Sequence, residues 1–202
     1  MASAAPVGFV IEPFHPSRHD RTGFAYGIKQ VDNYFRKTAN KLAKADNVRL
    51  FGMADPEGQV IGFYAINTHA VQYDELPTRY ARSRPSHGNI PAAYISMMGR
   101  DRKFQGGGYG GDLLVDALRR IANAADMVGI AVVMLDVLDC GDPERVARRK
   151  ALYEAYGFTA LPSNPLRMFL PLAIVRTILA EEAGDRSSSA DTADPGFPTP
   201  RA

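Results

Sequence analysis

The hydrophobic and polar positions of the first seventy residues alternate in patterns that predict three short strands and one helix. Residues 7–14 (VGFVIEPF) are apolar and β-branched, which is typical of a strand. Apolar residues between 27 and 45 recur at spacings near three and four, the period of an amphipathic helix. Residues 48–54 and 60–68 are again apolar, and the sequence DPEG between them favours a turn. This part of the chain therefore predicts a strand, a helix and a two-stranded hairpin.

The next part of the chain continues with a polar connection and then alternates strands with a helix. Residues 72–90 are polar and predict a long loop. Residues 92–99 (AAYISMMG) and 130–138 (IAVVMLDVL) are short apolar runs, which are typical of buried central strands. Between them, residues 111–123 place Leu and Ala side chains on one face of a helix. The pattern thus predicts a helix that connects two central strands.

A further helix and a last strand complete the domain. The sequence Asp142-Pro143-Glu144 is typical of a helix start, with Asp as the cap and Pro in the first turn, and Gly157 favours the helix end. Residues 167–175 predict a final strand. The order β-α-β-β-β-α-β-α-β indicates an α/β or α+β fold with one mixed sheet in a layered domain.

The composition is that of a soluble globular protein. A chain of 202 residues with 46% hydrophobic and 23% charged residues is long enough for one sizeable core. The formal net charge of +2 neither requires nor excludes a nucleic-acid partner. The single Cys140 favours a reducing compartment. Because neither a secretory signal nor a membrane-length apolar run is evident, we expect a cytoplasmic protein with no membrane partner.

Composition also suggests how the chain is divided. Residues 1–7 are expected to be a short leader, and residues 8–178 to be the catalytic domain. Residues 184–202 are rich in Ser, Asp and Pro. Such a segment buries too little apolar surface to offset its ordering entropy, so we expect a disordered tail.

The most informative segment lies between a predicted central strand and a predicted helix, where five of the six residues from Gly106 to Gly111 are glycine. Glycine allows positive backbone dihedral angles and lets a ligand approach without meeting a Cβ atom. Several backbone N–H groups then converge on one anion, in front of the positive end of the next helix. The cations of Arg102 and Lys103 lie beside the same position. The segment therefore predicts a phosphate site.

Three other interpretations of this glycine-rich turn explain the sequence less well. A dinucleotide-binding turn has the pattern G-x-G-x-x-G early in a parallel βαβ unit, whereas this turn follows four predicted strands. A Walker-type phosphate loop requires Lys-Ser or Lys-Thr, and neither follows Gly110 or Gly111. A flexible surface loop does not explain why glycines gather between two well-patterned elements.

Two motifs of this chain resemble those of the GCN5-related N-acetyltransferases. The sequence QGGGYG at residues 105–110 resembles the family's Q/R-x-x-G-x-G/A signature. The sequence ALYEAYGF at residues 151–158 is similar to the family's FYxxxGF helix end, with Leu152 in place of the usual Phe. Gly107 fills a position that is often polar. The resemblance spans residues 8–175 and implies the family's central mixed sheet, flanked by helices in a single domain.

The resemblance implies acetyl-CoA as the acetyl donor. The turn would bind the pyrophosphate through backbone amides, and the end of the preceding strand would hydrogen-bond the pantetheine arm like an added strand. A backbone N–H near Met98 would stabilise the tetrahedral oxyanion, an effect of roughly 3 kcal/mol in other acyl-transfer enzymes. The residues implied in donor binding are Met97, Gly99, Arg100, Arg102, Lys103, Gln105, Gly106, Gly107, Gly108, Tyr109 and Gly110.

Tyr153 matches the family's catalytic tyrosine, which implies a general acid for the departing thiolate. A phenol with a reference pKa of about 10 is protonated at neutral pH and can donate a proton or a hydrogen bond. The alternative is that Tyr153 only packs on an amphipathic helix. The paired motifs favour catalysis, and Tyr156, three positions on, is expected to be a core residue.

No general base stands out in the sequence. Asp74, Glu75 and Asp136 are candidates, although each is more often a solvated or capping carboxylate. An amine with a low pKa, such as an α-amino group, needs only water. The four histidines lack the spacing of metal ligands, so no metal is expected. Cys140 lacks a clear His partner for a covalent acetyl-enzyme route.

The opening and closing segments narrow the resemblance to acetyltransferase toxins. These segments are FAYG at 24–27, VDNYF at 31–35 and PLRMFLP at 165–171. Such relatives acetylate the amino group of aminoacyl-tRNA and are silenced by a ribbon-helix-helix antitoxin, so both are implied as partners, and a homodimer is a further expectation. The basic residues expected to contact tRNA phosphates are Arg79, Arg82, Arg84, Arg148, Arg149 and Lys150.

Two other classes of function remain open at this point. An N-acetyltransferase for a small-molecule or protein amine would share every motif and lack dependence on tRNA. A non-catalytic module that binds coenzyme A would bind the ligand without turnover. The basic residues also have an ordinary alternative as solvated surface charges.

Overall fold

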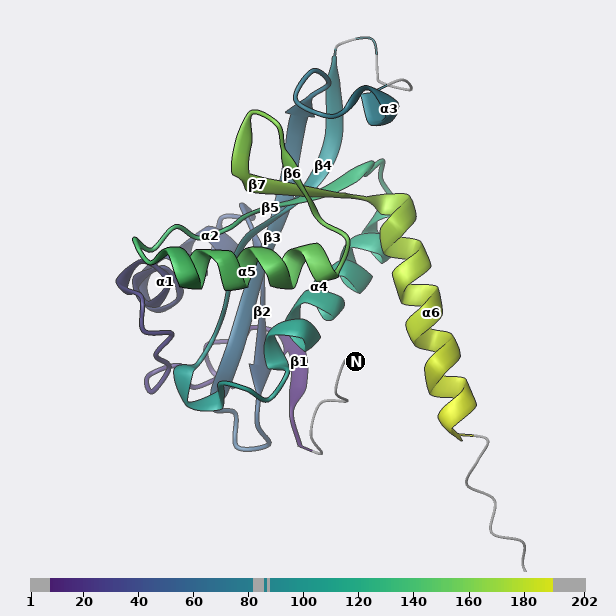
Figure 1. Cartoon of the computed structure of the whole chain (residues 1–202). Coiled ribbons are helices and arrows are strands. Elements are labelled where there is room, and N and C mark those ends of the chain that lie inside the picture. Colours follow the sequence, from purple (N-terminus) through teal and green to yellow (C-terminus); the bar gives the residue numbers. More distant parts are fainter. Residues whose placement is uncertain (1–7, 82–85, 87, 191–202) are drawn as a thin grey trace, which may run out of the picture.

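A mixed seven-stranded sheet forms the centre of the computed structural model, which describes residues 8–81, 86 and 88–190 (Figure 1). The strand order is β1-β2-β3-β4-β5-β7-β6, and only β4 and β5 are parallel neighbours. The strands are β1 (Val10–Pro13), β2 (Arg49–Ala54), β3 (Val60–Gln72), β4 (Asn89–Arg100), β5 (Val132–Asp136), β6 (Thr159–Leu161) and β7 (Asn164–Pro171). The predicted layered fold with a mixed sheet is confirmed.

The helices follow the predicted order, and the structure adds two short helical segments and a C-terminal helix. The predicted first helix is a continuous run of α1 (Lys29–Asn33), a π-helical turn η1 (Tyr34–Thr38) and α2 (Ala39–Lys44). The remaining helices are α3 (Thr78–Ala81), a 3-10 turn η2 (Arg102–Phe104), α4 (Tyr109–Ala125), α5 (Pro143–Ala155) and α6 (Leu172–Ala190). In Figure 1, α5 crosses in front of the sheet and α6 extends away from it.

The two faces of the sheet are covered by different helices. On one, called here the α4 face, Leu113 and Leu118 of α4 pack with alternate strand residues and with parts of α5 and α6. On the other, the α1 face, Phe35 packs against Phe63 with ring centroids 4.0 Å apart. Further along the α1 face, Leu76 and neighbouring residues form a separate small core. The α1 face therefore carries two hydrophobic clusters, with strand residues between them.

Two neighbouring strands, β4 and β5, separate in the middle of the sheet. The parallel strands β4 and β5 pair only from Ala92 to Ile95 of β4, whereas β4 continues to Arg100 beside β3. One extra residue of β4, Ser96, interrupts the β3–β4 register at this point. Such a bulge bends a strand and ends regular pairing. Residues 96–100 therefore have a strand neighbour on one side only, and this segment is called here the free edge of β4.

The end of the chain differs from the sequence prediction. The last strand was expected at 167–175, but β7 ends at Pro171, which lacks the N–H that would continue the ladder. Helix α6 follows at once and buries Val175 completely. It runs to Ala190, so residues 184–190 of the expected tail are helical, and the remaining tail lies outside the described residues. The leader at residues 1–7 also lies outside them.

The two strands that flank the predicted loop at 72–90 are longer than the sequence predicts. Strand β3 extends to Gln72 and β4 begins at Asn89, and the two strands stay paired to these residues. The short α3 lies between them, with Tyr80 packed edge-on against Phe169 at 5.4 Å. Among the described residues, none of the helices is both long and apolar enough to cross a bilayer.

Candidate functional site

The glycine-rich turn is anchored by a buried carboxylate that the sequence analysis did not single out. Asp101 is only 3% exposed. Its Oδ1 accepts a hydrogen bond from the Lys103 backbone N–H at 2.8 Å, which caps η2, and its Oδ2 accepts one from the Ala25 N–H at 2.8 Å. The Arg102 N–H donates to the Ala25 carbonyl at 2.9 Å. The turn is thus tied to the segment before α1.

The glycines give the turn the shape of an anion site. Gly106 (φ +93°) and Gly108 (φ +79°) adopt left-handed backbone conformations that favour glycine. Gly108 directly precedes the first residue of α4, so the free N–H groups of the first helical turn point out of the helix end. A Cβ atom at Gly106 or Gly110 would meet no other atom within 4 Å, and Arg102 and Lys103 are exposed beside the turn. These features fit a bound pyrophosphate.

Gly107 is explained by packing inside the turn. The ring of Tyr109 folds back and contacts Phe9 and Phe104 edge-on, with centroids 5.6 and 6.1 Å away. A Cβ atom at Gly107 would lie 2.3 Å from the Tyr109 ring. A side chain at this position would therefore displace Tyr109. Tyr109 holds the turn in place rather than facing outward, and Gln105 is exposed.

The predicted pantetheine-binding residues Met97, Met98 and Gly99 all lie on the free edge of β4. Gly99 is required by close packing, because a Cβ atom there would be 2.9 Å from Val31 and 3.1 Å from the Tyr26 ring. The free edge therefore lies beside Tyr26. Arg100 is the last residue of the edge and leads directly into Asp101.

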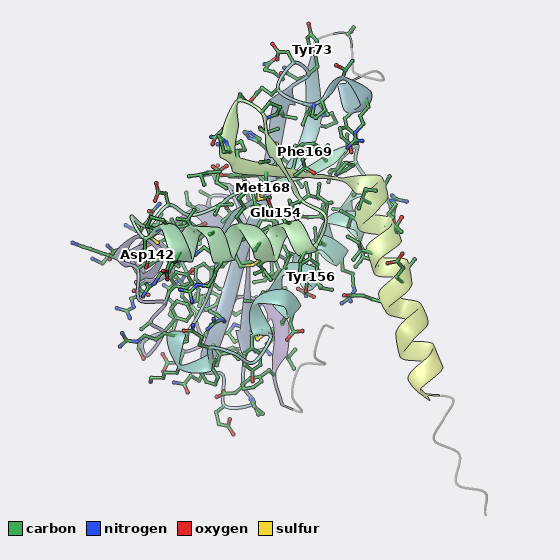
Figure 2. All side chains as sticks on the ribbon, viewed as in Figure 1. Tyr73, Asp142, Glu154, Tyr156, Met168 and Phe169 are labelled. Carbon is green, nitrogen blue, oxygen red and sulfur yellow. The ribbon has the colours of Figure 1, made fainter. Side chains whose placement is uncertain are left out.

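Tyr153 faces the same region from α5. This helix begins as predicted, with Asp142 accepting a hydrogen bond from the Arg145 N–H at 3.1 Å (the helix is seen in Figure 2 with Asp142, Glu154 and Tyr156 labelled). The half-buried Tyr153 ring meets Phe158 edge-on at 6.0 Å. Burial, aided by the nearby Tyr26 phenol and opposed by the Arg149 guanidinium, raises the pKa of Tyr153 to about 12. Tyr153, Tyr26 and Arg149 therefore lie within electrostatic reach of one another.

Arg149, which the sequence predicts to contact tRNA, has three hydrogen-bond partners within the protein. Its guanidinium donates hydrogen bonds to the Tyr26 hydroxyl at 3.0 Å, the Leu138 carbonyl at 3.2 Å and the Cys140 sulfur at 3.2 Å. These bonds connect α5 to the segment before α1, one helical turn before Tyr153. Its bond to Cys140 lowers the pKa of that thiol.

The other predicted tRNA contacts lie in several places. Arg148 is exposed on α5, next to Lys150, which pairs with Glu154 at 3.7 Å. Arg79 is exposed on α3, with its guanidinium 4.5 Å from the centre of the Tyr80 ring. Arg82 and Arg84 fall outside the described residues. The basic residues that the structure describes therefore do not form one continuous patch with Arg149.

Asp136, one candidate for the general base, is committed to other partners. It accepts two hydrogen bonds from Arg167 at 2.8 and 2.9 Å and one from the Tyr94 hydroxyl at 2.7 Å. The Arg167 contact holds the pKa of Asp136 below its usual value, and desolvation together with Asp136 raises the pKa of Tyr94 to about 12. A carboxylate that resists protonation is a poor base. Glu75 instead accepts from the Gln72 N–H at 3.2 Å, and Asp74 is exposed.

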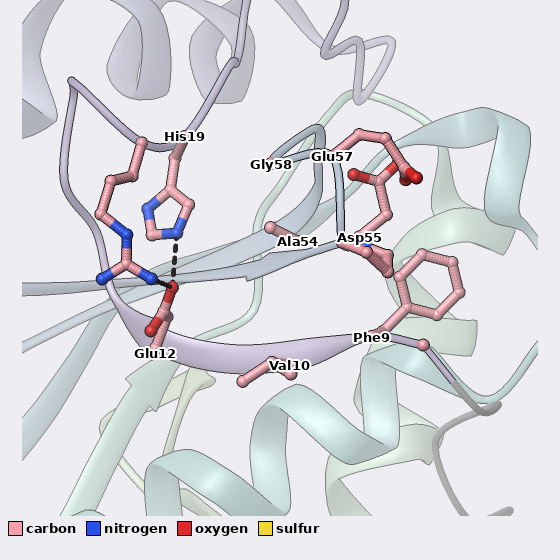
Figure 3. Close-up of a pocket in the computed structure, with 11 residues that line it drawn as sticks. Phe9, Val10, Glu12, His19, Ala54, Asp55, Glu57 and Gly58 are labelled. Atoms are coloured by element: carbon pink, nitrogen blue, oxygen red, sulfur yellow. Dashed lines mark hydrogen bonds and ion pairs between the residues drawn. The ribbon is translucent and has the colours of Figure 1, made fainter.

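A pocket of about 590 Å³ lies between β1 and the turn that joins β2 to β3 (Figure 3), and none of the predicted donor-binding residues lines it. The His19 Nε2 atom hydrogen-bonds Glu12 at 2.9 Å on one wall, and Asp55 and Glu57 lie on another. Three carboxylates make the pocket unsuited to pyrophosphate. In the described part of the chain, no group of three or more His, Cys, Asp or Glu side chains is placed to hold a metal ion.

Two positions important to the site, Asp101 and Tyr26, were not recognised from the sequence. An Asp between a strand and a turn is a capping signal, so Asp101 could have been found locally. Tyr26 has no such signal, because its partners Gly99 and Arg149 are distant in sequence. Its FAYG context resembles the toxin opening, but the contact itself depends on the fold.

Comparison with known proteins identifies the relatives of this chain. No family model matches it. It is 61% identical over 180 residues to the "probable toxin TacT" of Sinorhizobium fredii, covering 89% of this chain and 99% of the relative. It is 30% identical over 162 residues to the "tRNA-acetylating toxin" of Mycobacterium tuberculosis, covering 80% and 92%.

Solved structures share the fold at lower identity. The toxin AtaT in complex with acetyl-methionyl-tRNAfMet superposes with a TM-score of 0.74 at 21% identity, covering 85% of this chain and 99% of AtaT. In a further structure, a tyrosine-to-phenylalanine mutant of AtaT is bound to acetyl-CoA and to the C-terminus of the antitoxin AtaR, with a TM-score of 0.70 at 19% identity and coverage of 85% and 98%. The two curated sequence relatives carry the assignment, and the chain belongs to the family of tRNA-acetylating toxins, N-acetyltransferases with the GCN5-related fold.

Proposed function

We propose that this chain transfers the acetyl group of acetyl-CoA to the α-amino group of an aminoacyl-tRNA, and that it acts as the toxin of a toxin–antitoxin pair. The observation that carries the proposal is the convergence of three features: the glycine-rich turn, the free edge of β4, and Tyr153 on α5. These features supply a phosphate site, a backbone for the pantetheine arm and a proton donor along one path. The toxin relatives support the choice of acceptor.

Acetyl transfer forms one bond and breaks another. The amine nitrogen attacks the thioester carbonyl carbon, the new C–N bond forms and the C–S bond breaks. The attacking amine loses one proton and the departing thiolate gains one, so charge and atoms balance. The protein must hold the thioester, stabilise the oxyanion and provide a hydrogen bond to sulfur.

The turn and the free edge are assigned to the first two tasks. The N–H groups at the start of α4 and the exposed side chains of Arg102 and Lys103 would bind the pyrophosphate. The free edge of β4 would hydrogen-bond the pantetheine arm, and a backbone N–H near Met98 would stabilise the oxyanion. Ser96 lies where β4 leaves β5, so the edge is open where a ligand strand would add.

Tyr153 is assigned to the departing sulfur. Its pKa of about 12 keeps the phenol protonated at neutral pH, so it remains a hydrogen-bond donor throughout the reaction. A phenol of this pKa is a weaker acid than a thiol, whose reference pKa is about 8.5. Tyr153 therefore stabilises the thiolate by hydrogen bonding, and the proton that reaches sulfur is balanced by the one the amine releases.

The acceptor explains why a strong general base is unnecessary. A free α-amino group has a reference pKa of about 7.7–8.0, against about 10.4 for lysine. A substantial fraction of such an amine is neutral at cellular pH. Asp136 is engaged by Arg167, which is consistent with a reaction in which water, rather than a carboxylate, carries the proton from the amine toward sulfur. Charged tRNA as substrate would also place the protein in the cytoplasm.

The proposal is tested by incubating the purified protein with radiolabelled acetyl-CoA and a bulk pool of charged tRNA. We expect label in the acid-precipitable tRNA, and loss of that label after mild alkali cleaves the aminoacyl ester. Uncharged tRNA is the matched control and should remain unlabelled. If label instead enters polyamines, free amino acids or protein amines, the acceptor assignment is wrong, although the acetyltransferase assignment stands.

Arg148→Glu is expected to weaken tRNA binding without affecting the donor. The side chain is exposed on α5, whereas its neighbour Arg149 is engaged inside the protein. Loss of a phosphate contact should raise the apparent KM for charged tRNA roughly tenfold and reduce its salt dependence. The KM for acetyl-CoA should not change. Arg176→Glu is the control, because it reverses a charge at an exposed site on α6. Equal effects of the two variants would mean that only the net charge of the protein affects tRNA binding and that Arg148 makes no specific contact.

An antitoxin is proposed as the protein partner, in keeping with the AtaT–AtaR neighbour. The expected partner is a ribbon-helix-helix protein. Expression of this chain alone should arrest growth and translation, and co-expression of the adjacent open reading frame should restore both. Continued growth of cells that contain active protein would contradict the toxin role.

A further inference from the structure

A row of polar side chains crosses the middle of the α1 face. It consists of Asn67 on β3, Tyr94 on β4, Asp136 on β5 and Arg167 on β7. Asn67 is paired with Tyr94, and Asp136 with Arg167, so each pair points to the same side of the sheet. The row lies between the two hydrophobic clusters of this face. Interior strands of a covered sheet are normally apolar, so a polar row there suggests a binding surface.

Most polar groups of this row are hydrogen-bonded to one another, but one acceptor atom is not. The Asp136 carboxylate is bound by Arg167 and by the Tyr94 hydroxyl. In contrast, the Asn67 Oδ1 atom is buried and has no hydrogen-bond partner among the described residues. A buried acceptor without a donor is costly, and native proteins rarely keep one without a function.

A second unpartnered polar atom lies on the same face. The Tyr34 hydroxyl oxygen is buried and likewise makes no hydrogen bond of normal geometry in the described part of the chain, although Ser96 lies beside it. Tyr34 opens the π-helical turn η1, and its ring stacks on Phe63 with centroids 6.2 Å apart. Ser96 is the bulge residue at the start of the free edge, and its hydroxyl donates to the Ala65 carbonyl at 3.3 Å.

The register of β3 brings these two atoms to one place. Phe63, Ala65 and Asn67 alternate onto the α1 face, so Asn67 lies two residues, roughly 7 Å, beyond Ala65. Tyr34 stacks over Phe63 and reaches Ser96, which is bonded to Ala65. Asn67 and Tyr34 therefore flank the point where β4 leaves β5. A thioester held along the free edge would have its carbonyl near this point.

We propose that Asn67 Oδ1 and Tyr34 Oη accept hydrogen bonds from the two N–H groups of the acceptor's α-amino group; this inference rests on the proposed function. A neutral primary amine carries two N–H hydrogens and one lone pair. Binding both hydrogens on the α1 face leaves the lone pair directed at the thioester carbon. Asn67 and Tyr34 thus orient the nucleophile, which brings it into the geometry that acyl transfer requires.

The charges around this site keep the amine neutral. The titratable groups that face it on the α1 face are Tyr34, Tyr94, His69, Asp136 and Arg167. Nearby are also Tyr26, which precedes α1, and Tyr153 and Arg149 of α5. Arg167 neutralises Asp136 through two hydrogen bonds. The direct acceptors, an amide and a phenol, are uncharged. A carboxylate in place of the amide would stabilise the ammonium form and withhold the lone pair.

The test replaces Asn67 by Asp, which has the same shape, and follows the pH dependence of kcat at saturating charged tRNA, which reports the pKa of the bound amine. The new carboxylate should raise the pKa of the bound amine, so the rising limb of the profile should move upward by about one pH unit or more. At pH 7 kcat should fall at least roughly tenfold. Asn67→Ala and Tyr34→Phe should lower kcat/KM roughly tenfold each with the rising limb unmoved. Donor affinity should be unchanged in all three.

Asn123→Asp is the matched control, since it makes the same chemical change at an exposed site on α4. Its pH profile should equal that of the wild type. If the wild type acetylates charged tRNA and the rising limb of Asn67→Asp stays within about 0.2 pH units of it, the inference is wrong and the proposed function stands. If the wild type acetylates no charged tRNA, both are overturned.

Discussion

Tyr153→Phe should reduce turnover roughly 10²–10⁴-fold while acetyl-CoA affinity and thermal stability remain close to those of the wild type. The hydroxyl is the group assigned to the departing thiolate, and the ring that packs against Phe158 is retained. Loss of the donor affects the transition state, in which negative charge develops on sulfur, more than the bound ground state. Single-turnover rates with saturating charged tRNA, together with the acetyl-CoA dissociation constant, measure the two effects separately.

Tyr156→Phe is the matched control, because it removes the same atom from the residue that caps the C-terminal end of α5. The Tyr156 hydroxyl lies against α4, where a Cβ atom at Gly111 would be 2.6 Å from it. Its loss should change turnover by less than about threefold. Similar turnover in Tyr153→Phe and the wild type would mean that Tyr153 only packs in the core.

The raised pKa of Tyr153 also has a consequence for the wild-type pH profile. The protonated phenol is the active form, and a pKa of about 12 extends that form upward in pH from the reference value of about 10. Between pH 6 and about pH 9.5, initial rates should therefore rise with deprotonation of the amine and then level off. A falling limb below about pH 9.5 that Tyr153→Phe abolishes would show that the phenol ionises earlier than its burial indicates.

Gly110→Glu should weaken acetyl-CoA binding more than about 100-fold with little effect on folding. Gly110 lies in the first turn of α4 with an ordinary helical backbone, and a side chain there would extend into open space. A carboxylate near a helix N-terminus does not destabilise the helix. Its repulsion of a pyrophosphate charge about 5 Å away is roughly 3 kcal/mol at an effective dielectric constant of 20, which corresponds to more than about 100-fold in affinity.

Thermal denaturation with and without ligand measures this effect. Ligand at about 100 times its dissociation constant should stabilise the wild type by roughly 2.7 kcal/mol, and the same concentration should stabilise the glutamate variant by less than about 0.5 kcal/mol. Gly110→Ala is the control, because the Q/R-x-x-G-x-G/A pattern accepts alanine at this position. Gly108 is less suitable for substitution, since its φ of +79° would strain any other residue. An undiminished shift in Gly110→Glu would move the donor site elsewhere.

The sequence by itself determined the features that depend on neighbouring residues. Strand and helix periodicity indicated all but the shortest elements up to Gly157, because burial of one face requires a regular spacing of apolar residues. The cap at Asp142 and the turn before α4 were equally local, since capping and positive φ angles depend on single residue types. The paired motifs indicated acetyl transfer.

At two places the local sequence pattern fits more than one structure. Residues 167–175 are apolar enough for a strand, yet Pro171 ends the ladder and the residues after it satisfy a helical spacing equally well. Arg149 has the same charge as Arg148, and nothing in the sequence distinguishes the two. On α5 one points inward to Tyr26 and the other outward to solvent, because their positions on the helix differ by about 100°.

Only the tertiary structure decided which distant residues meet. Asp101 bonds Ala25 across 76 positions of sequence, and Arg149 bonds Tyr26 across 123. The polar row depends on the registers of four strands, and a shift of one residue would turn Asn67 to the opposite face. Register and helix docking are set by the packing of the whole core. The composition of the amine site is therefore a property of the assembled sheet rather than of any segment of the chain.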